Sequence, residues 1–391
     1  MSAPITTSRR NFMKLAATAT GGLYLGFHWT ADASPIMQVL DESAVASGNI
    51  GFNSYLSIST EDVITIMSPN PELGQNIKTS FPMVVAEELD ADWSKVKVLQ
   101  APLDPTKFER QVTGGSGAVP HSWERLRKAG ATARHMLIEA ASKRWNVPPT
   151  ELTTENSTVI HAGSGKKFSY GELATEASKV PVPAEIILKN RKDFKLIGTA
   201  VRNVDNYEMI TGKPLYGLDF YREGMLFAMI QRPDSFGMKI KSVDSAAAKA
   251  SPGIIDVVTF KNNVAVVGKS TWQINKARKL LKIEYEKEGN IESTADHDKL
   301  FKDLLDSTDA SVVQMRRKDG DVDAAFKSAA KVIKREYQCP FLSHSPMEPM
   351  NFFAHVRPDG VELVGPTQTP EAARNETAKL LGISPYTITV E

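Results

Sequence analysis

The sequence has little cysteine and no excess of either charge. Only one of its 391 residues is a cysteine, Cys339. A disulfide framework is therefore excluded, and so is a cysteine-ligated iron–sulfur cluster, which takes about four thiolates. Lys and Arg total 47 against 46 Asp and Glu, so no surplus of positive charge is available to displace counterions from nucleic acid. We expect no nucleic acid partner, and any iron–sulfur chemistry must lie on another polypeptide.

Histidine is also scarce, and long apolar runs are missing. The seven histidines are scattered and offer no dense metal cage. No apolar run reaches the roughly 20 residues that a membrane-spanning helix needs, so we expect no transmembrane span in the mature chain. The remaining composition, 41% apolar and 24% charged, is typical of a globular protein with two or three domains.

The N-terminus, residues 1–33, has the pattern of a twin-arginine signal peptide. Arg9-Arg10 precede a weakly apolar stretch from Leu15 to Trp29, and Ala31-Asp32-Ala33 matches a small-x-small cleavage site. A disordered basic tail is the alternative. The twin-arginine route exports folded proteins, which suits a cofactor inserted in the cytoplasm. We therefore expect a periplasmic protein.

Apolar spacing predicts mixed strands and helices in the first half of the chain. The expected elements are a strand over 62–68, a helix marked by Phe81, Val85 and Leu89, a short strand at Val96 and Val98, a long amphipathic helix from Trp123 to the prolines at 148–149, and a short helix opened by a capping box of Ser169 and Glu172. A linker-like stretch then begins at Pro181.

The second half is expected to hold a compact α+β unit and the beginning of another. The expected elements are a buried strand from Met225 to Ile230, a small helix from Asp244 to Ala250, strands at Ile254–Phe260 and Val264–Val267, a helix from Trp272 to Leu281, a strand with Ile283 and Tyr285, charged helices within 287–330, a hairpin over 351–364, a helix from Glu371 to Leu381 closed by Gly382, and a strand over 386–391. A strand at that position would leave an open sheet edge, so we expect the sequence to be the front part of a longer protein.

One glycine-rich turn is a candidate anion site. Gly114-Gly115-Ser116-Gly117 lies between a strand and the long helix, where small residues let backbone amides approach a phosphate. Pro120 occupies the third glycine position of a dinucleotide fingerprint and excludes that motif. An ordinary tight turn remains the alternative.

Two other patterns do not predict a site. Residues 163–167 resemble a P-loop, but Ile160 stands where the first glycine is required, so we expect a hairpin turn there. His344 and Glu348 have helical metal-ligand spacing, but Pro346 between them disfavours a helix. We therefore expect a structural role for His344.

Two glutamines stand on loops that precede helices, Gln75 and Gln368. A side-chain amide offers two donors and two acceptor lone pairs, which suits the edge of a heterocycle. An ordinary loop role is the alternative for both. The residues alone indicate an exported α+β protein with candidate anion sites, and they name no reaction.

Several short motifs occur in a characteristic order after the twin-arginine leader. They are Glu72-Leu73-Gly74-Gln75, Ala86-Glu87-Glu88-Leu89, Thr113-Gly114-Gly115-Ser116, Thr211-Gly212-Lys213-Pro214-Leu215-Tyr216-Gly217, His344-Ser345-Pro346-Met347-Glu348-Pro349 and Thr367-Gln368-Thr369-Pro370. Together they resemble the molybdopterin-binding large subunit of the xanthine dehydrogenase and aldehyde oxidase superfamily. The most similar branch is that of the isoquinoline 1-oxidoreductase beta subunit, and the resemblance covers essentially the whole chain.

The resemblance implies an α+β architecture in several parts. These are a permuted molybdopterin-binding domain segment over 50–180, a linker over 181–206, a small α+β hammerhead domain over 207–290, a charged helical connection over 291–330, and a truncated first molybdopterin-binding domain over 331–391. The family's later glycine-rich loop and catalytic glutamate would lie beyond Glu391. The resemblance therefore implies that this portion is inactive alone.

The resemblance also implies which residues contact the cofactor, with no metal ligand supplied by the protein. The matching positions are Gly74 and Gln75, then Thr113, Gly114, Gly115 and Ser116 near the pterin or pyrophosphate, and Gln368 near the oxo ligand of molybdenum. Two departures stand out. Asn76 replaces a usual glycine, and Gly117 and Ala118 replace common hydroxyl residues.

By resemblance, the cofactor is molybdopterin cytosine dinucleotide with molybdenum. The family oxidises N-heteroaromatic or aldehyde substrates with oxygen from water, and it passes electrons to a small [2Fe-2S] partner subunit and, in this branch, toward a candidate cytochrome c acceptor. The alternative, suggested by Asn76 and by the missing glutamate base, is a non-catalytic exported scaffold or interaction protein on the same fold.

Overall fold

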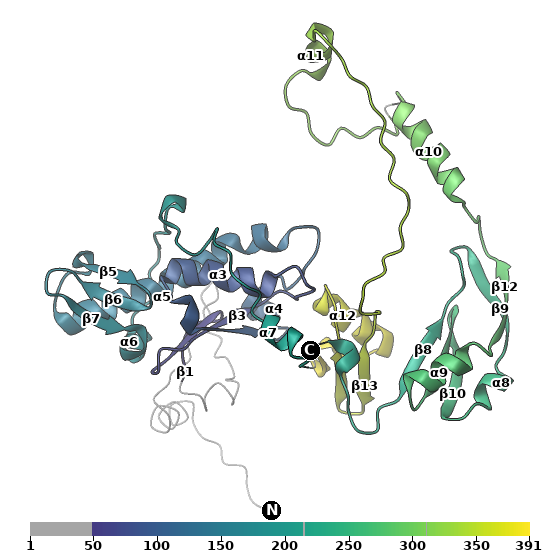
Figure 1. Cartoon of the computed structure of the whole chain (residues 1–391), viewed down its shortest axis with the longest axis horizontal. Helices are drawn as coiled ribbons and strands as arrows, with labels where there is room; N and C mark the ends of the chain where they lie inside the picture. The colour runs from purple at the N-terminus through teal and green to yellow at the C-terminus, as the bar shows by residue number, and fades with distance from the viewer. Residues whose placement is uncertain (1–48, 214–215, 310) are drawn as a thin grey trace, which may run out of the picture. The chain divides into compact units, whose positions relative to one another are not determined.

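The computed structural model describes residues 49–213, 216–309 and 311–391. The signal peptide predicted over 1–33 lies outside the described residues. Two compact units are present, one formed by residues up to Phe220 together with Glu348–Glu391, and the other by Tyr221–Met347 (Figure 1). None of the helices in the described part of the chain is long and apolar enough to cross a membrane.

The first unit contains a four-stranded sheet with helices packed on it. The strands are β1 (Asn49–Asn53), β2 (Leu56–Ser59), β3 (Ile64–Ser68) and β4 (Val96–Gln100), in that order, and the helices are α3 (Ile77–Leu89), α4 (Pro105–Phe108) and α5 (Ala118–Trp145). The pairs β1–β2 and β2–β3 are antiparallel, whereas β3–β4 is parallel with α3 as the crossover. The strands expected at 62–68 and at Val96 are confirmed.

Helices α3 and α5 pack closely along one another. The residues that predicted α3, Phe81, Val85 and Leu89, are all buried. The contact is closest at Gly130 of α5, where an added Cβ would lie 2.2 Å from the Val85 carbonyl oxygen. The predicted long helix is confirmed, and it ends at Asn146, which adopts a left-handed C-cap with φ 55°.

A three-stranded antiparallel meander and a short helix follow α5. They are β5 (Leu152–Glu155), β6 (Thr158–His161), β7 (Lys166–Ser169) and α6 (Tyr170–Ala177). The predicted capping box is present, since Glu172 N donates to Ser169 Oγ at 3.3 Å and Ser169 N donates to Glu172 Oε2 at 2.8 Å. The hairpin turn expected at 163–167 joins β6 to β7.

The predicted linker over 181–206 has little regular structure, but it is anchored to α3. One oxygen of the buried Glu87 carboxylate accepts hydrogen bonds from the amides of Lys195, Leu196 and Ile197 at 3.0, 2.6 and 3.0 Å. The other oxygen forms an ion pair with Lys189 Nζ at 2.9 Å. A short helix, α7 (Asn206–Ile210), follows.

Residues 348–391 add a separate sheet to the first unit. It comprises β13 (Phe353–Arg357), β14 (Gly360–Val364) and β15 (Ile388–Val390), with α12 (Pro370–Leu381) between the last two. The β13–β14 hairpin is confirmed, and β15 runs parallel to β14. Gly382 ends α12 with φ 66°, as predicted.

The second unit is an α+β fold with a small core. Its elements are β8 (Phe227–Gln231), β9 (Met238–Asp244), α8 (Ala246–Lys249), β10 (Ile254–Phe260), β11 (Asn263–Gly268), α9 (Thr271–Arg278) and β12 (Lys282–Lys287). They form a sheet of order β10-β11-β8 and a pair β12-β9, with Val264, Val266 and Ile274 fully buried.

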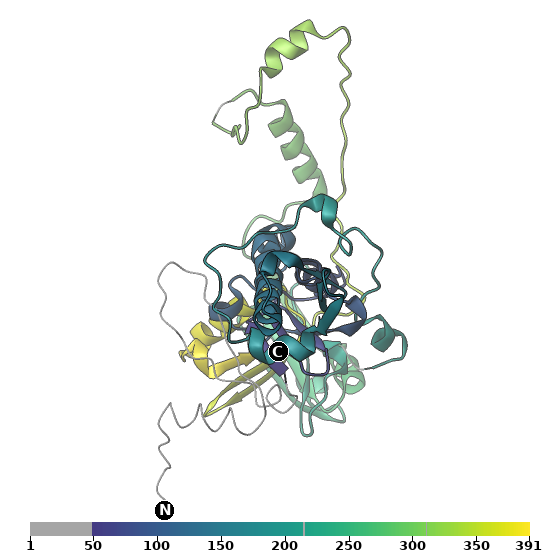
Figure 2. The same cartoon turned by 90° about the vertical axis from the view of Figure 1, so that its left-hand side faces the viewer.

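Two expectations for this unit need correction. The strand predicted as buried from Met225 to Ile230 instead alternates half-buried and exposed residues in β8, because Phe227 and Met229 pack against the core on one face while the other face is exposed. Strand β9 was not predicted, and it pairs with β12. After β12, α10 (Thr294–Asp306) and α11 (Val322–Ser328) confirm the charged helices, and stretches without regular structure join them (Figure 2).

Candidate functional site

Three loops from distant parts of the sequence meet in the first unit. They precede α3, α5 and α12, respectively. Thr113 N donates to the Gln368 carbonyl at 3.0 Å, and Gln368 Nε2 donates to the Thr113 carbonyl at 2.8 Å. The Pro71 carbonyl accepts from Thr113 Oγ1 at 2.8 Å and from Gln75 Nε2 at 3.0 Å. Gln75, Thr113 and Gln368 therefore belong to one continuous set of hydrogen bonds.

The predicted site residues on these loops differ in how much of their surface is exposed. Thr113 is buried, with 8% of its surface exposed, while Gln75 and Gln368 are exposed, as are Gly115 and Ser116. Thr113 thus acts as a buried junction, and the other four residues remain accessible to a ligand. The structure brings the predicted site residues together, and their contacts with a cofactor stay a prediction.

Two buried side-chain amides, those of Asn70 and Gln111, hold the backbone next to the loops that precede α3 and α5. Asn70 Nδ2 donates to the Val112 carbonyl at 2.7 Å. Gln111 Nε2 donates to the carbonyls of Pro69 at 3.1 Å and Pro102 at 2.8 Å. Asn70 and Gln111 are buried, with 1% and 3% of their surfaces exposed. These amides satisfy the carbonyl groups of irregular backbone and fix its position.

The loop before α3 is held by an acid that sequence analysis did not single out for this role. One oxygen of the Glu72 carboxylate accepts from Gly74 N at 2.6 Å and from Asn76 N at 3.1 Å, and the other accepts from Lys78 N at 2.9 Å. This is a carboxylate at a helix N-terminus, which the helix dipole favours. The available signal was an acidic residue just before a glycine turn and a helix start. These amides are therefore already engaged by an anion of the chain itself.

Asn76 keeps the backbone conformation that a glycine would provide. It is the N-cap of α3 and is left-handed, with φ 67°. Asparagine tolerates this region better than most residues with a side chain. Its side-chain oxygen accepts from Asn203 Nδ2 at 2.5 Å. The departure at this position therefore changes the side chain while the turn is retained.

The turn before α5 leaves helix amides open. Gly115 and Ser116 have φ 59° and 55°, and the N-cap Gly117 makes no side-chain capping bond. The first-turn amides of a helix have no intrahelical acceptor and can bind an anion. In α5 they are the amides of Ala118 and Val119, because Pro120 has no N–H and His121 N already donates to the Gly117 carbonyl at 3.1 Å. An added Cβ at Gly117 would lie 3.1 Å from His121 Cδ2 and 3.4 Å from Arg110 Nη1. The two neighbours leave little room at Gly117 itself, but they place the Arg110 guanidinium beside the start of α5, where a cation and free amides are the kind of donors that bind a phosphate.

The motifs around Tyr216 and Glu348 also contact each other. Glu348 Oε1 accepts from Leu218 N at 3.0 Å and from Asn351 Nδ2 at 2.9 Å. An added Cβ at Gly217 would lie 2.3 Å from Asn351 Oδ1 and 2.6 Å from Cδ of the rigid Pro366 ring, so the position favours glycine. Residues 344 and 348 are not on a helix. Across the described residues, no group of three His, Cys, Asp or Glu side chains is placed to hold a metal ion.

Comparison with known proteins identifies the family. Two models described as molybdopterin cofactor-binding domains match residues 35–212 and 305–391. The chain is 29% identical to the beta subunit of isoquinoline 1-oxidoreductase from Brevundimonas diminuta, over 99% of this chain and 55% of that protein. It is 31% identical to a membrane-bound aldehyde dehydrogenase (pyrroloquinoline-quinone) of Gluconacetobacter polyoxogenes, over 90% of this chain and 47% of that protein.

A third relative is a nicotinate dehydrogenase subunit from Pseudomonas putida, 28% identical over 84% of this chain and 28% of that protein. The chain thus spans about half the length, or less, of these curated relatives. Gln75 and Thr113 lie in one matched region, and Gln368 lies in the other. With the two molybdopterin cofactor-binding domain models matched in separate regions and similarity to the isoquinoline 1-oxidoreductase beta subunit over 99% of this chain, the chain is a portion of a molybdopterin-binding large subunit of the xanthine dehydrogenase and aldehyde oxidase superfamily.

Proposed function

We propose that this chain is part of the large subunit of a molybdenum hydroxylase and that its three hydrogen-bonded loops bind the molybdopterin cofactor. One observation carries the proposal. Thr113, from the first matched region, is bonded directly to Gln368, from the second. Residues far apart in sequence thereby form one surface with open amides and side-chain amides, which are the donors that a phosphate and a heterocycle require.

In this proposal the residues of the three loops have separate roles in binding the cofactor. The open amides at the start of α5 and the Arg110 guanidinium bind phosphate oxygens, which suits the pyrophosphate of a cytosine dinucleotide form. Gln368 presents the second N–H of an amide whose first N–H is held by the Thr113 carbonyl. Gln75 braces its own loop through Pro71. When bound, the cofactor supplies two-electron oxidation at molybdenum, while these residues hold and orient it.

The relatives' names indicate the substrate class. They refer to isoquinoline, to an aldehyde and to nicotinate. We infer that the whole protein oxidises N-heteroaromatic or aldehyde substrates with oxygen from water. In this proposal electrons leave through a [2Fe-2S] partner subunit toward a cytochrome c. In this proposal the cofactor is inserted in the cytoplasm, and the twin-arginine signal then directs the folded enzyme to the periplasm. The permuted segment covers residues 50–180 and the hammerhead domain residues 207–290.

Metal and nucleotide analysis of the purified protein, copurified with its partners, tests this function. We expect stoichiometric molybdenum and release of a cytosine nucleotide on acid hydrolysis. The matched comparison is Arg110→Ala against Lys143→Ala, an exposed residue near the other end of α5. The first should lower both contents and the second neither. Absence of molybdenum and of nucleotide from the unaltered protein would instead support the non-catalytic scaffold.

A further inference from the structure

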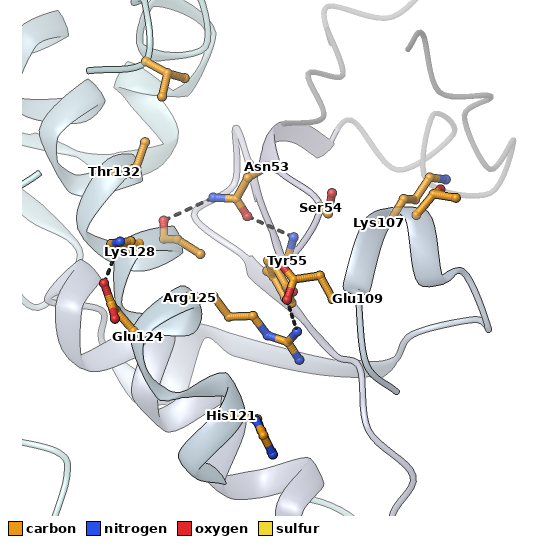
Figure 3. Close-up of a pocket in the computed structure, with 13 residues that line it drawn as sticks. Asn53, Ser54, Tyr55, Lys107, Glu109, His121, Glu124, Arg125, Lys128 and Thr132 are labelled. Carbon is orange, nitrogen blue, oxygen red and sulfur yellow. Dashed lines mark hydrogen bonds and ion pairs between the residues drawn. The ribbon is translucent and has the colours of Figure 1, made fainter. Parts of the chain in front are cut away.

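The charged side chains around the cavity of the first unit pair with one another. This cavity of about 300 Å³ lies between α5, α4 and the turn that joins β1 to β2 (Figure 3). Its two carboxylates both have cationic partners, since Glu109 pairs with Arg125 at 2.8 Å and Glu124 pairs with Lys128 at 2.6 Å. Opposite charges are thus matched in this wall, and the situation differs at one helix of the second unit.

The second unit has more cations than its acids can pair with. Residues 239–287 contain ten Lys and Arg residues but only four Asp and Glu residues. Each of the four acids forms an ion pair with a different lysine, and the pairs are Lys239–Glu286, Lys241–Glu284, Lys249–Asp256 and Lys282–Asp244. The other cations have no ion-pair partner among the described residues, and Lys269, Lys276, Arg278 and Lys279 of this group lie in α9 or directly beside it.

The outer side of α9 combines two of these cations with an exposed tryptophan. Ile274 and Ala277 are fully buried in the core of the unit. Trp272, Lys276 and Lys279 are exposed and have the spacing i, i+4 and i+7, which places them on the opposite side of the helix. Trp272 has 67% of its surface exposed, and Lys276 Nζ lies 4.4 Å from the centre of its ring. Together these three residues form the α9 face.

The composition of the α9 face favours an anionic lipid surface over a protein surface as its partner. Lysine is depleted at protein–protein interfaces, whereas tryptophan together with lysine is typical of segments that lie on a membrane. The ring of tryptophan suits the headgroup region, and the long lysine chains keep their ammonium groups at the level of the phosphates. No acidic residue occurs between Asp256 and Glu284 to oppose this attraction.

We propose that the α9 face binds the surface of a membrane that contains anionic phospholipids. The ammonium groups of Lys276 and Lys279 contact lipid phosphates, and the Trp272 ring enters the headgroup region beside them. The contact is peripheral, because α9 has eight residues and its inner side is buried in the unit. Binding through so few charges is reversible and weakened by salt. It uses none of the residues assigned to the cofactor.

Cosedimentation with lipid vesicles tests the requirement for negative charge. The protein is used in its exported form, without the predicted signal peptide over 1–33, so that the apolar stretch of that peptide does not bind lipid. We expect binding to vesicles of equal parts phosphatidylglycerol and phosphatidylcholine, at least about tenfold stronger than to phosphatidylcholine alone, and loss of binding in about 0.5 M sodium chloride. Equal binding to both vesicles, or binding to neither, would overturn the proposal.

A pair of double variants with the same net charge tests the α9 face itself. Lys276→Gln combined with Lys279→Gln should weaken binding to the anionic vesicles about tenfold or more. Lys261→Gln combined with Lys287→Gln removes two exposed cations of the same unit outside α9 and should weaken it less than about twofold. Thermal unfolding checks that both are folded. Equal weakening by the two double variants would mean that binding depends only on net charge, which overturns the proposal. Loss of copurification with a partner subunit in the first variant, with vesicle binding unchanged, would assign the face to a protein instead.

The tryptophan provides a local measurement of the same contact. Brominated phospholipids quench the fluorescence of tryptophans that enter the bilayer, and the other tryptophans of the exported form lie in the first unit. We expect vesicles that contain phosphatidylglycerol and brominated phosphatidylcholine to quench the unaltered protein, and Trp272→Phe to remove most of that quenching. Quenching that is unchanged in Trp272→Phe would show that α9 does not face the membrane.

Discussion

Thr113 and Gln368 hold each other through two hydrogen bonds across 255 positions of sequence. The Thr113 amide donates to the Gln368 carbonyl at 3.0 Å, and Gln368 Nε2 donates back to the Thr113 carbonyl at 2.8 Å. The second bond determines that the amide nitrogen of Gln368, and not its oxygen, faces Thr113. Two family-matched regions of the chain are thus joined at the point where both present their loops.

Replacing Gln368 by glutamate should destabilise the unit more than replacing it by alanine. Alanine removes one hydrogen bond, at a cost of about 1 kcal/mol, while an ionised glutamate places oxygen against the Thr113 carbonyl oxygen. The difference between the two variants in free energy of unfolding, measured in urea, should disappear below about pH 4, where the glutamate is protonated. Equal stability of the variants at pH 7 would contradict the assigned orientation of the amide.

Glu72→Gln should loosen the loop that precedes α3. The substitution keeps one acceptor oxygen but removes the charge that three amides share at the helix N-terminus. We expect a loss of about 1 kcal/mol, with faster hydrogen exchange confined to the amides of Gly74, Asn76 and Lys78. The control is Glu185→Gln, an exposed residue. Unchanged exchange at those three amides would show that Glu72 does not hold the loop.

Sequence reasoning succeeded where structure depends on neighbouring residues. The period of Phe81, Val85 and Leu89 predicted α3, and the capping box of Ser169 and Glu172 formed as expected. These patterns act within one or two helical turns, so no knowledge of the fold is needed. The glycine that ends α12 belongs to the same class.

Sequence reasoning failed where a side chain forms a hydrogen bond to backbone that is distant in the sequence and lies close to it only in the folded chain. Gln111 reaches the carbonyl of Pro69, 42 positions away, and Glu87 reaches the amides of a segment more than 100 positions away. Strand β9 was missed because its pairing with β12 is non-local. The connection of the Gln75 and Gln368 loops through Thr113 was expected from family resemblance, since no local pattern requires it.

Gly130→Ala should destabilise the first unit although alanine favours helices. Intrinsic propensity alone predicts a gain of about 1 kcal/mol. The new Cβ, however, would meet the Val85 carbonyl oxygen at 2.2 Å and Glu88 Cβ at 3.0 Å, so α3 and α5 must separate. We expect a net loss of about 2 kcal/mol or more. In Lys143→Ala, on the exposed face of the same helix, urea unfolding should change by less than about 0.5 kcal/mol. A stabilised Gly130→Ala variant would refute the close packing.

Glu87→Gln should release the segment over 181–206 from α3. The carboxylate holds Lys189 and three consecutive amides, and its neutral replacement keeps only part of this set. We expect a loss of about 2–3 kcal/mol in unfolding free energy. Trypsin should also cleave faster after Lys189 and Lys195. Glu185→Gln, in the same segment, provides the control, and equal cleavage of both variants would exclude the anchoring role.

The Glu87 carboxylate should also make the unfolding free energy of the first unit depend on pH under acidic conditions. Burial acts to raise the pKa of Glu87, but hydrogen bonds from Lys189 and from the amides of Ile197 and Leu196 outweigh it, so the pKa lies below its ordinary value of 4.5. A lowered pKa in the folded state contributes stability that is complete above the unfolded value and is lost as pH falls through the folded value. The stability gap between the unaltered protein and Glu87→Gln should therefore be constant from pH 7 to about 5 and then shrink at lower pH. Urea unfolding at a series of pH values measures this gap, and a gap that widens on acidification would mean that the folded state raises the pKa of Glu87.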